Sequence, residues 1–462
     1  MHSSHDPHHP HAQPDVLAAI REDLVNSREW VSRAIVLVYA ALAGGSVVGF
    51  TWICDRALHL FSDWRGAHPW IPFLLTPTLC ALIAWVTSRF VPGATGSGIP
   101  QVMTALHSSV SETERHGLVS LKLAITKIGL CAGGLLGGLP IGREGPSVQI
   151  AAGVMLHARR WLPANSVVQP HALLVAGGAA GIAAAFNAPL AGVMFAIEEL
   201  TRKIEQRTSG LVVAAIVLAG LIAVSAFGNS TYFGVIRVPR LDRGFIGPAL
   251  CVVVASGLLG GFFSRLLHAS LVGQPDRFSR WRAAHPVKFA AACGLAIAVV
   301  GFVSGGAAFG SGYAKTRALV EGQVDMPLLY VTLRIVATWL AIWSGVPGGL
   351  FAPTLAIGAG LGNDVAIFTG FEAHSPALIA LGMAGFLAAV TQAPITAFII
   401  VMEMVDGHAM VLSLMAAALG ASLLARWLSH PLYSALSAAQ LANLAKKRAA
   451  AEEKSVATQP AG

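Results

Sequence analysis

Long apolar segments recur along the chain and constrain its fold more than any other feature. In hydrocarbon, every backbone N–H and C=O must be paired within its own segment, so such segments fold as helices. With 55% hydrophobic and only 12% charged residues, the 462-residue chain has the composition of a polytopic membrane protein. We therefore predict an all-α fold whose helices cross the bilayer many times. The runs long enough to cross it, or nearly so, are 34–53, 70–86, 211–227, 245–267, 289–303, 328–343 and 410–424.

The net charge of +8 would suit a nucleic-acid-binding protein, but the positions of the basic residues favour another explanation. They stand in the segments between apolar runs and near both ends of the chain, as the positive-inside rule predicts. We expect no nucleic-acid partner, and we expect both termini on the cytoplasmic side. The five cysteines lack metal-ligand spacing, and the clustered histidines of residues 1–15 fix no ligand geometry, so we expect no metal site and no cofactor.

Three short landmarks occur twice in the chain, in the same order. Such an internal repeat indicates two related halves, although order alone leaves a parallel or an inverted arrangement open. Glycine- and proline-interrupted segments at matching positions of two halves indicate a transport site at the bilayer midplane, shared between the halves. The landmarks are GSG at 96–98 and 310–312, GREGP at 142–146 and GLFAP at 349–353, and AP at 188–189 and 393–394.

The repeat also predicts where the parts of the chain begin and end. We expect a first transmembrane repeat at 34–228 and a second at 245–428. Residues 1–33 would form a tail followed by an interfacial helix from residue 16. Residues 429–462 would form a tyrosine-bearing segment and a short cytoplasmic tail, too short for a regulatory domain of usual size.

The segment 140–146, Pro-Ile-Gly-Arg-Glu-Gly-Pro, places two charged side chains between long apolar runs. An ionisable residue in hydrocarbon is costly, so Glu144 is a candidate functional residue. Glycines on either side interrupt a continuous helix, while Pro146 suits the first turn of a new one. The free N–H groups of that turn would form an anion site with a carboxylate beside it. The alternative is a structural ion pair between Arg143 and Glu144.

Four motifs in order, GSGIP at 96–100, GREGP at 142–146, GGLFAP at 348–353 and PLY at 431–433, resemble the CLC family of chloride channels and chloride/proton antiporters. The resemblance extends over nearly the whole membrane body. It implies two inverted-topology repeats whose broken and tilted helices meet at an anion site. It also implies a homodimer with a complete pathway in each subunit, of the prokaryotic type, in the bacterial inner membrane.

The same resemblance assigns the anion site. Chloride would be held by the hydroxyls of Ser97 and Tyr433 and by the backbone amides of Leu350 and Phe351. Partial charges suit this task, because a full positive charge would bind chloride too tightly to release it. Taken alone, Ser97 would be read as a turn residue and Tyr433 as an interfacial aromatic anchor.

Glu144 resembles the external gating glutamate of the family. Its carboxylate would compete with chloride for the same amides, and protonation would remove the charge and open the site. One residue could thus exchange a proton for an anion.

The repeat assigns different roles to two adjacent glutamates, Glu198 and Glu199. Glu198 aligns with Glu403, so it should serve a position common to both halves, such as capping a segment at their interface. Glu199 aligns with Met404 and breaks the symmetry, and it resembles the internal proton glutamate of the family. The alternative is a solvated glutamate near Arg202.

We therefore predict a secondary active antiporter that exchanges chloride for protons across a lipid bilayer. One alternative is a passive chloride channel of the same fold, gated by voltage or pH. A fluoride/proton antiporter is another, although Tyr433 and the serine of GSGIP favour chloride. An intramembrane enzyme is not favoured, because the chain contains neither HExxH nor GxSxG.

Overall fold

The computed structural model describes residues 27–201, 209–228, 231–236, 243–273, 276–323, 326–327 and 329–457. Regular structure in these residues is helical, apart from one isolated antiparallel bridge between Gly142 and Gly349. Nine helices within the same residues are long and apolar enough to cross a membrane. The predicted all-α polytopic fold is therefore confirmed. The histidine-rich tail, most of the predicted interfacial helix and Arg202 lie outside the described residues.

The helices of the first half follow one another in a fixed order. They are α2 (Ser27–Ala67), α3 (Ile71–Phe90), α4 (Ile99–Ala105), α5 (Glu112–Leu118), α6 (Leu121–Leu136), α7 (Glu144–His157), α8 (Pro170–Phe186), α9 (Pro189–Phe195), a π-helical turn η3 (Ala196–Thr201) and α10 (Ser209–Phe227). Short 3-10 turns lie at Pro92–Ala94 and Ala158–Arg160.

The second half repeats this order with few changes. Its helices are α11 (Ile246–Val272), α12 (Arg277–Ala284), α13 (Pro286–Val303), α14 (Tyr313–Val320), α15 (Tyr330–Trp343), α16 (Phe351–Thr369), α17 (Ser375–Thr391), α18 (Pro394–Met404) and α19 (Val411–Arg426), followed by α20 (Leu432–Ala457). Short turns lie at Arg243–Phe245, Glu372–His374 and Gly407–Met410.

The two halves have matching internal packing and an inverted relation. Helix α7 packs on α8 as α16 packs on α17, and α2 packs on α10 as α11 packs on α19. Both α8 and α17 are followed directly by a cap residue with left-handed backbone, Asn187 (φ 55°) and Gln392 (φ 58°). The loops that precede α7 and α16 meet in the antiparallel bridge, so equivalent segments run in opposite directions. Two inverted repeats with broken helices are thus the architecture of the molecule.

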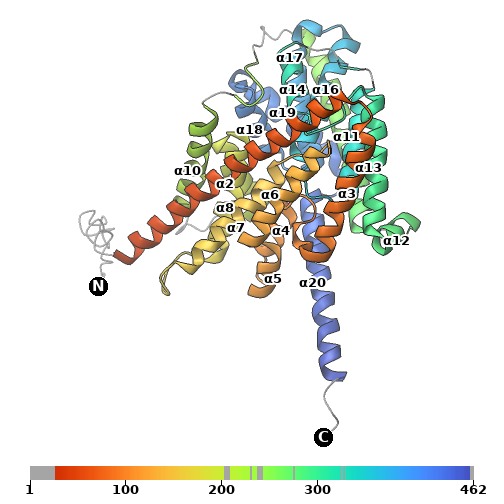
Figure 1. The fold of residues 1–462 in the computed structure, drawn as a ribbon. Helices are drawn as coiled ribbons and strands as arrows, with labels where there is room; N and C mark the ends of the chain where they lie inside the picture. The colour runs from red at the N-terminus through yellow and green to blue at the C-terminus, as the bar shows by residue number, and fades with distance from the viewer. Residues whose placement is uncertain are drawn as a thin grey trace, which may run out of the picture.

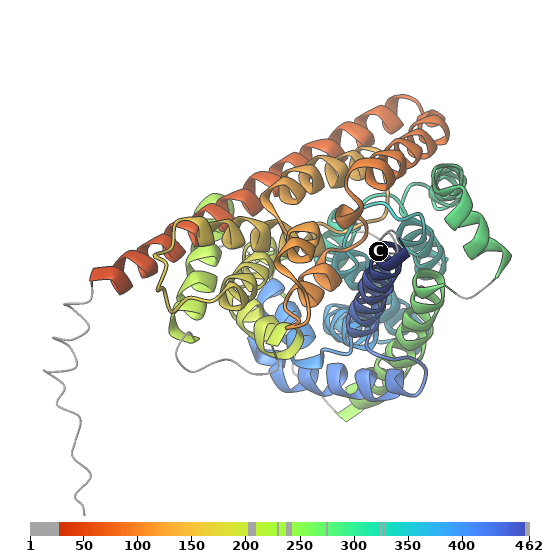
Figure 2. The same cartoon turned by 90° about the horizontal axis from the view of Figure 1, so that it is seen from below.

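Helix α2 crosses the molecule obliquely. Its 41 residues would be about 60 Å long at 1.5 Å per residue, roughly twice the thickness of a bilayer core. Figure 1 shows it running diagonally across the other helices, and Figure 2 shows it along one edge of the molecule. Residues 27–33 are the first turns of this helix and are continuous with the first span.

The helices that begin at the centre of the molecule are buried on all sides. Nearly every side chain of α7, α8, α16 and α17 is buried, which explains why these segments are apolar around their whole circumference. Peripheral helices instead expose large apolar side chains, as expected for surfaces in contact with lipid. The deepest core therefore surrounds the helix starts at the junction of the two halves.

The last helix, α20, begins in the core and projects away from the body (Figure 1). We predicted a tyrosine-bearing segment and a short cytoplasmic tail here, and the structure joins them in one continuous helix. Its alanine- and lysine-rich sequence has high helix propensity, which supports the projecting turns where packing is sparse. The side of the molecule on which α20 ends, which also holds α5 and α12, is called the α20 face below.

Candidate anion-binding site

The loops GREGP and GGLFAP join the two halves at the centre of the molecule. Gly142 N–H donates to the Gly349 carbonyl at 2.8 Å, and Gly349 N–H donates to the Gly142 carbonyl at 2.7 Å. The backbones approach so closely that a side chain on Gly349 would stand 2.8 Å from the Gly145 nitrogen. Directly after this bridge, α7 starts at Glu144 and α16 starts at Phe351. The predicted helix start at GREGP is confirmed.

Glu144 reaches from α7 to the start of α16. Its side chain is fully buried, and its Oε2 accepts a long hydrogen bond of 3.4 Å from the Ala352 amide. Its Oε1 has no hydrogen-bond partner among the described residues. The first N–H groups of a helix lack partners within the helix and favour negative charge. The carboxylate therefore lies where the amides of Leu350 and Phe351 are predicted to receive chloride.

Arg143 is paired with a residue other than Glu144. Its guanidinium forms an ion pair with Asp55 of α2 and donates to the Tyr232 hydroxyl at 2.9 Å and to the Thr51 carbonyl at 3.5 Å. The alternative of an Arg143–Glu144 ion pair is therefore wrong. Sequence reasoning missed Asp55, although an aspartate shortly after the first apolar run was a usable signal.

Ser97 and Tyr433 lie at the same centre. Both side chains are buried, their hydroxyls lie beside each other, and neither makes a hydrogen bond of standard geometry among the described residues. The Ser97 hydroxyl lies so close to the start of α7 that a side chain on Gly145 would collide with it. The Tyr433 ring stacks on Phe351, with centroids 6.1 Å apart and planes at 22°. Buried hydroxyls without such a bond are costly, and an anion is a partner that both could donate to.

Two cavities approach this centre from opposite sides. The α14-side cavity has a volume of about 220 Å³ and is lined by Asp55, Arg143 and Tyr232, among others. The α20-side cavity has a volume of about 190 Å³ and is lined by Ser97, Leu350 and Tyr433 at its inner end. Glu144 follows Arg143 in the chain and contacts α16 just beyond Leu350, so it lies between the two cavities.

Buried cations hold the glycine-rich loops, and sequence reasoning missed them. Lys127 of α6 donates to the Gly96 carbonyl at 2.9 Å and to Gln149 Oε1 at 2.7 Å. Arg334 of α15 donates to the Gly310 carbonyl at 2.7 Å and to two neighbouring carbonyls. Lys127 stands fifteen residues before Gly142, and Arg334 stands fifteen residues before Gly349, so the two are equivalent in the repeat. The signal in the sequence was one basic residue inside an otherwise apolar run, Lys127 in the first half and Arg334 in the second.

The two aligned glutamates cap helices of the opposite halves. Glu198 accepts from the amides of Ile395 at 3.1 Å and Thr396 at 2.7 Å, at the start of α18. Glu403 accepts in the same way at the start of α9, from Leu190 at 3.2 Å and Ala191 at 2.7 Å. The capping role expected for Glu198 is confirmed.

Glu199 lies half-buried in the π-helical turn η3. The helix before this turn, α9, ends at Phe195, whose ring contacts Phe351 at a centroid distance of 6.4 Å. Irregular π-helical turns are frequent at functional sites. The turn thus places a carboxylate on an element that also contacts the anion-site aromatic residue.

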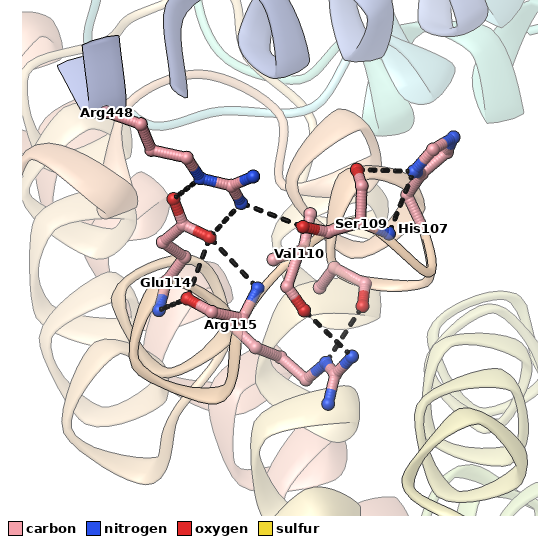
Figure 3. Close-up of polar contacts among 8 residues, drawn as sticks. His107, Ser109, Val110, Glu114, Arg115 and Arg448 are labelled. Carbon is pink, nitrogen blue, oxygen red and sulfur yellow. Dashed lines mark hydrogen bonds and ion pairs between the residues drawn. The ribbon is translucent and has the colours of Figure 1, made fainter. Parts of the chain in front are cut away.

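Hydrogen bonds and an ion pair connect α20 to α4 and α5. Tyr433 lies at the start of α20 and Ser97 just before α4, so these contacts hold the two residues in a fixed relation. Thr104 Oγ1 lies 3.0 Å from both Ser437 Oγ and Gln440 Oε1. Further along α20, Arg448 pairs with Glu114 and donates to the Ser109 carbonyl at 2.8 Å (Figure 3). Glu114 also completes the capping box of α5 with Ser111.

Inverted repeats, helix starts that converge on a buried carboxylate, and two buried hydroxyls beside it define a class of membrane protein with a candidate site at the centre of its fold. The model of the family described as voltage gated chloride channel matches residues 79–426. The chain belongs to this family, the CLC family.

Two curated relatives cover almost the whole chain. An H(+)/Cl(-) exchange transporter ClcA from Cronobacter sakazakii is 31% identical over 94% of this chain and 95% of its own length. A protein of the same name from Citrobacter koseri is 30% identical over 95% of this chain and 96% of its own length.

Solved structures share the fold. A slow cyanobacterial Cl-/H+ antiporter superposes with a TM-score of 0.75 at 24% identity, covering 89% of this chain and 98% of its own. A CLC-type fluoride/proton antiporter gives 0.69 at 21% identity, covering 88% of this chain and 97% of its own. At these identities the likeness concerns the fold alone.

Proposed function

We propose that this chain is a secondary active antiporter that exchanges chloride for protons. The observation that supports this function best is the position of the Glu144 carboxylate, at the start of α16 and near two buried hydroxyls. A charged carboxylate and a chloride ion compete there for the same backbone amides and hydroxyls. Binding of one therefore opposes binding of the other.

The exchange follows from this competition. Chloride arriving from the α20-side cavity is received by Ser97, Tyr433 and the amides of Leu350 and Phe351. It displaces the carboxylate of Glu144 toward the α14-side cavity, where the carboxylate takes up a proton. The neutral side chain no longer repels the anion. Release of the proton on the opposite side of the membrane completes the cycle.

Glu199 supplies the second proton position in this proposal. Its half-buried place in η3 lets it exchange protons with solvent while its element contacts the anion site through Phe195 and Phe351. The whole-length relatives that are named H(+)/Cl(-) exchange transporters support exchange over a passive channel. A fluoride substrate is less favoured, because the fluoride/proton antiporter shares only the fold.

The protein is integral to a membrane, and its finer placement is part of the proposal. We place it in a bacterial inner membrane with the α20 face in the cytoplasm. Helices α5, α12 and α20 lie on this face (Figure 1), and they carry basic residues that include Arg115, Arg280 and Lys446, in keeping with positive-inside orientation. We further propose a homodimer with one pathway in each subunit.

The decisive experiment is a measurement of reversal potential with purified protein in liposomes. Chloride is held at a fixed gradient while a pH gradient is imposed. For an antiporter the reversal potential moves with the pH gradient, because net charge movement depends on both ions. A potential that stays at the chloride equilibrium value would mean a passive channel. Glu199→Gln should keep chloride transport and lose proton transport, and loss of both would reduce Glu199 to a structural role.

A further inference from the structure

The α20-side cavity is lined by a single charged side chain among its described residues, Arg282 of α12. A second cavity, of about 320 Å³, adjoins it and shares Thr95, Arg282 and Gly345 with it. Arg282 is again its only charged lining residue within the part of the chain that the structure describes. The guanidinium therefore lies where the two cavities meet, and the α20-side cavity extends from there to Ser97 and Tyr433.

The position of Arg282 is determined by its surroundings. Its Nη1 donates to the Ser270 carbonyl of α11 at 3.0 Å, and its side chain is half-buried. The ion pairs found among the described residues do not include Arg282, so no carboxylate neutralises it there. A cation that is held by one carbonyl keeps further N–H donors for a ligand.

Helix α12, which carries Arg282, is anchored although none of its residues is buried. The Phe278 ring lies 6.1 Å from Trp343, and the Trp281 ring lies 5.2 Å from Phe289. The Asp276 carboxylate caps the helix by accepting from the Ser279 amide at 2.9 Å. Hydrogen bonds from Ser279 lower the pKa of Asp276, so the cap is charged at neutral pH. The arginine is therefore presented by an anchored element.

We infer that Arg282 forms a staging site for monovalent inorganic anions at the mouth of the pathway, from which chloride passes to Ser97 and Tyr433. This site deepens the proposed function and rests on it. The remaining polar lining residues, such as Gln440 and Asn443, are neutral. An uncompensated cation in a concave, partly apolar site concentrates anions there and raises their rate of arrival. Because the site is open to solvent, binding stays weak enough for the ion to move on.

The test compares Arg282→Gln with Arg282→Lys and with a matched control, Arg280→Gln. Arg280 lies on the same helix, is exposed, and lines neither cavity. Initial rates of radioactive chloride uptake are measured in inside-out and right-side-out membrane vesicles, so that chloride is presented to one face at a time. Ionic strength is varied with an impermeant salt.

For chloride at the α20 face, we expect Arg282→Gln to raise KM about fivefold at low ionic strength while kcat changes much less, as for loss of one exposed charge contact. High ionic strength should reduce the difference, because salt screens exposed charges. The KM of Arg282→Lys should stay close to the wild-type value, and the KM of Arg280→Gln should equal the wild-type value. Chloride presented to the opposite face should show no change in KM.

Three results would overturn the staging site. They are an unchanged KM in Arg282→Gln, an equal rise in Arg280→Gln, or a defect in Arg282→Lys as large as that in Arg282→Gln. As a second measurement, crystals of the wild-type protein grown in bromide should show an anomalous peak at the guanidinium, and the absence of this peak would also contradict it. The reversal potential of wild type tests exchange separately, so failure of the staging site and failure of the proposed function remain distinguishable.

Discussion

At the scale of single residues, the pairing of charges decides what Glu144 can do. Arg143 is engaged by Asp55 and Tyr232, so it does not hold the neighbouring carboxylate in a salt bridge. Among the described residues, the Glu144 side chain accepts one hydrogen bond of standard geometry, the long one from the Ala352 amide. A weakly held buried carboxylate can be displaced by an anion or neutralised by a proton at small cost.

We predict that Glu144→Gln keeps anion flux and loses proton coupling, because glutamine imitates the protonated state permanently. The reversal potential of this variant should stay at the chloride equilibrium value under any pH gradient. Glu372→Gln, on an exposed turn, serves as the control and should behave as wild type. Proton uptake driven by chloride in the Glu144→Gln protein would refute the role given to this residue.

At the scale of elements, each half of the molecule caps a helix of the other. Helices α9 and α18 both begin with proline, which has no N–H, and the following amides donate to Glu403 and Glu198 respectively. These contacts join residues about two hundred positions apart in the chain, and they obey the symmetry of the repeat.

Removing either cap should destabilise the junction of the halves to a similar extent. We expect Glu198→Ala and Glu403→Ala each to lower the free energy of unfolding by about 1 kcal/mol, as for loss of a helix cap. The measurement is the thermal unfolding of each purified variant in detergent, with Glu372→Ala as the exposed control. Equal melting temperatures for all three variants would show that the caps contribute no stability.

At the scale of the whole molecule, the peripheral helices carry large exposed apolar side chains. On α19, Leu412 is 75% exposed and Leu423 is 58% exposed. Such surfaces are covered by lipid or by a second copy of the chain. The candidate anion site, by contrast, is assembled from helices of one chain, so each subunit of a dimer would hold a complete pathway.

A dimer with independent pathways makes a quantitative prediction. Differently tagged wild-type and Glu144→Gln chains are co-expressed, and the mixed dimer is purified through both tags. Its coupled proton flux should be half that of the wild-type dimer. Complete loss of proton flux would indicate that the two subunits work only together, and failure to recover any mixed dimer would argue against the assembly.

Several features of this protein were determined by the sequence alone, because their physical causes are local. Apolar runs must form helices in lipid, and glycine and proline interrupt them where GREGP and GGLFAP stand. The repeated landmarks showed the two halves, and the same repeat predicted a cap at Glu198. The candidate anion-site residues came from the resemblance to the CLC family that four short motifs carry. The structure brings Ser97 and Glu144 to the start of α7, and Phe351 and Tyr433 to one ring stack.

Other features were decided only by the tertiary structure, because they join residues that are far apart in the chain. Nothing near Arg143 in sequence indicates that Asp55 is its partner, and nothing near Gly96 indicates that Lys127 holds its carbonyl. The contact between Arg448 and Glu114 and the placement of Arg282 at a cavity junction likewise depend on how the helices pack. Local rules specify where helices begin and end, whereas packing decides which buried charges become partners.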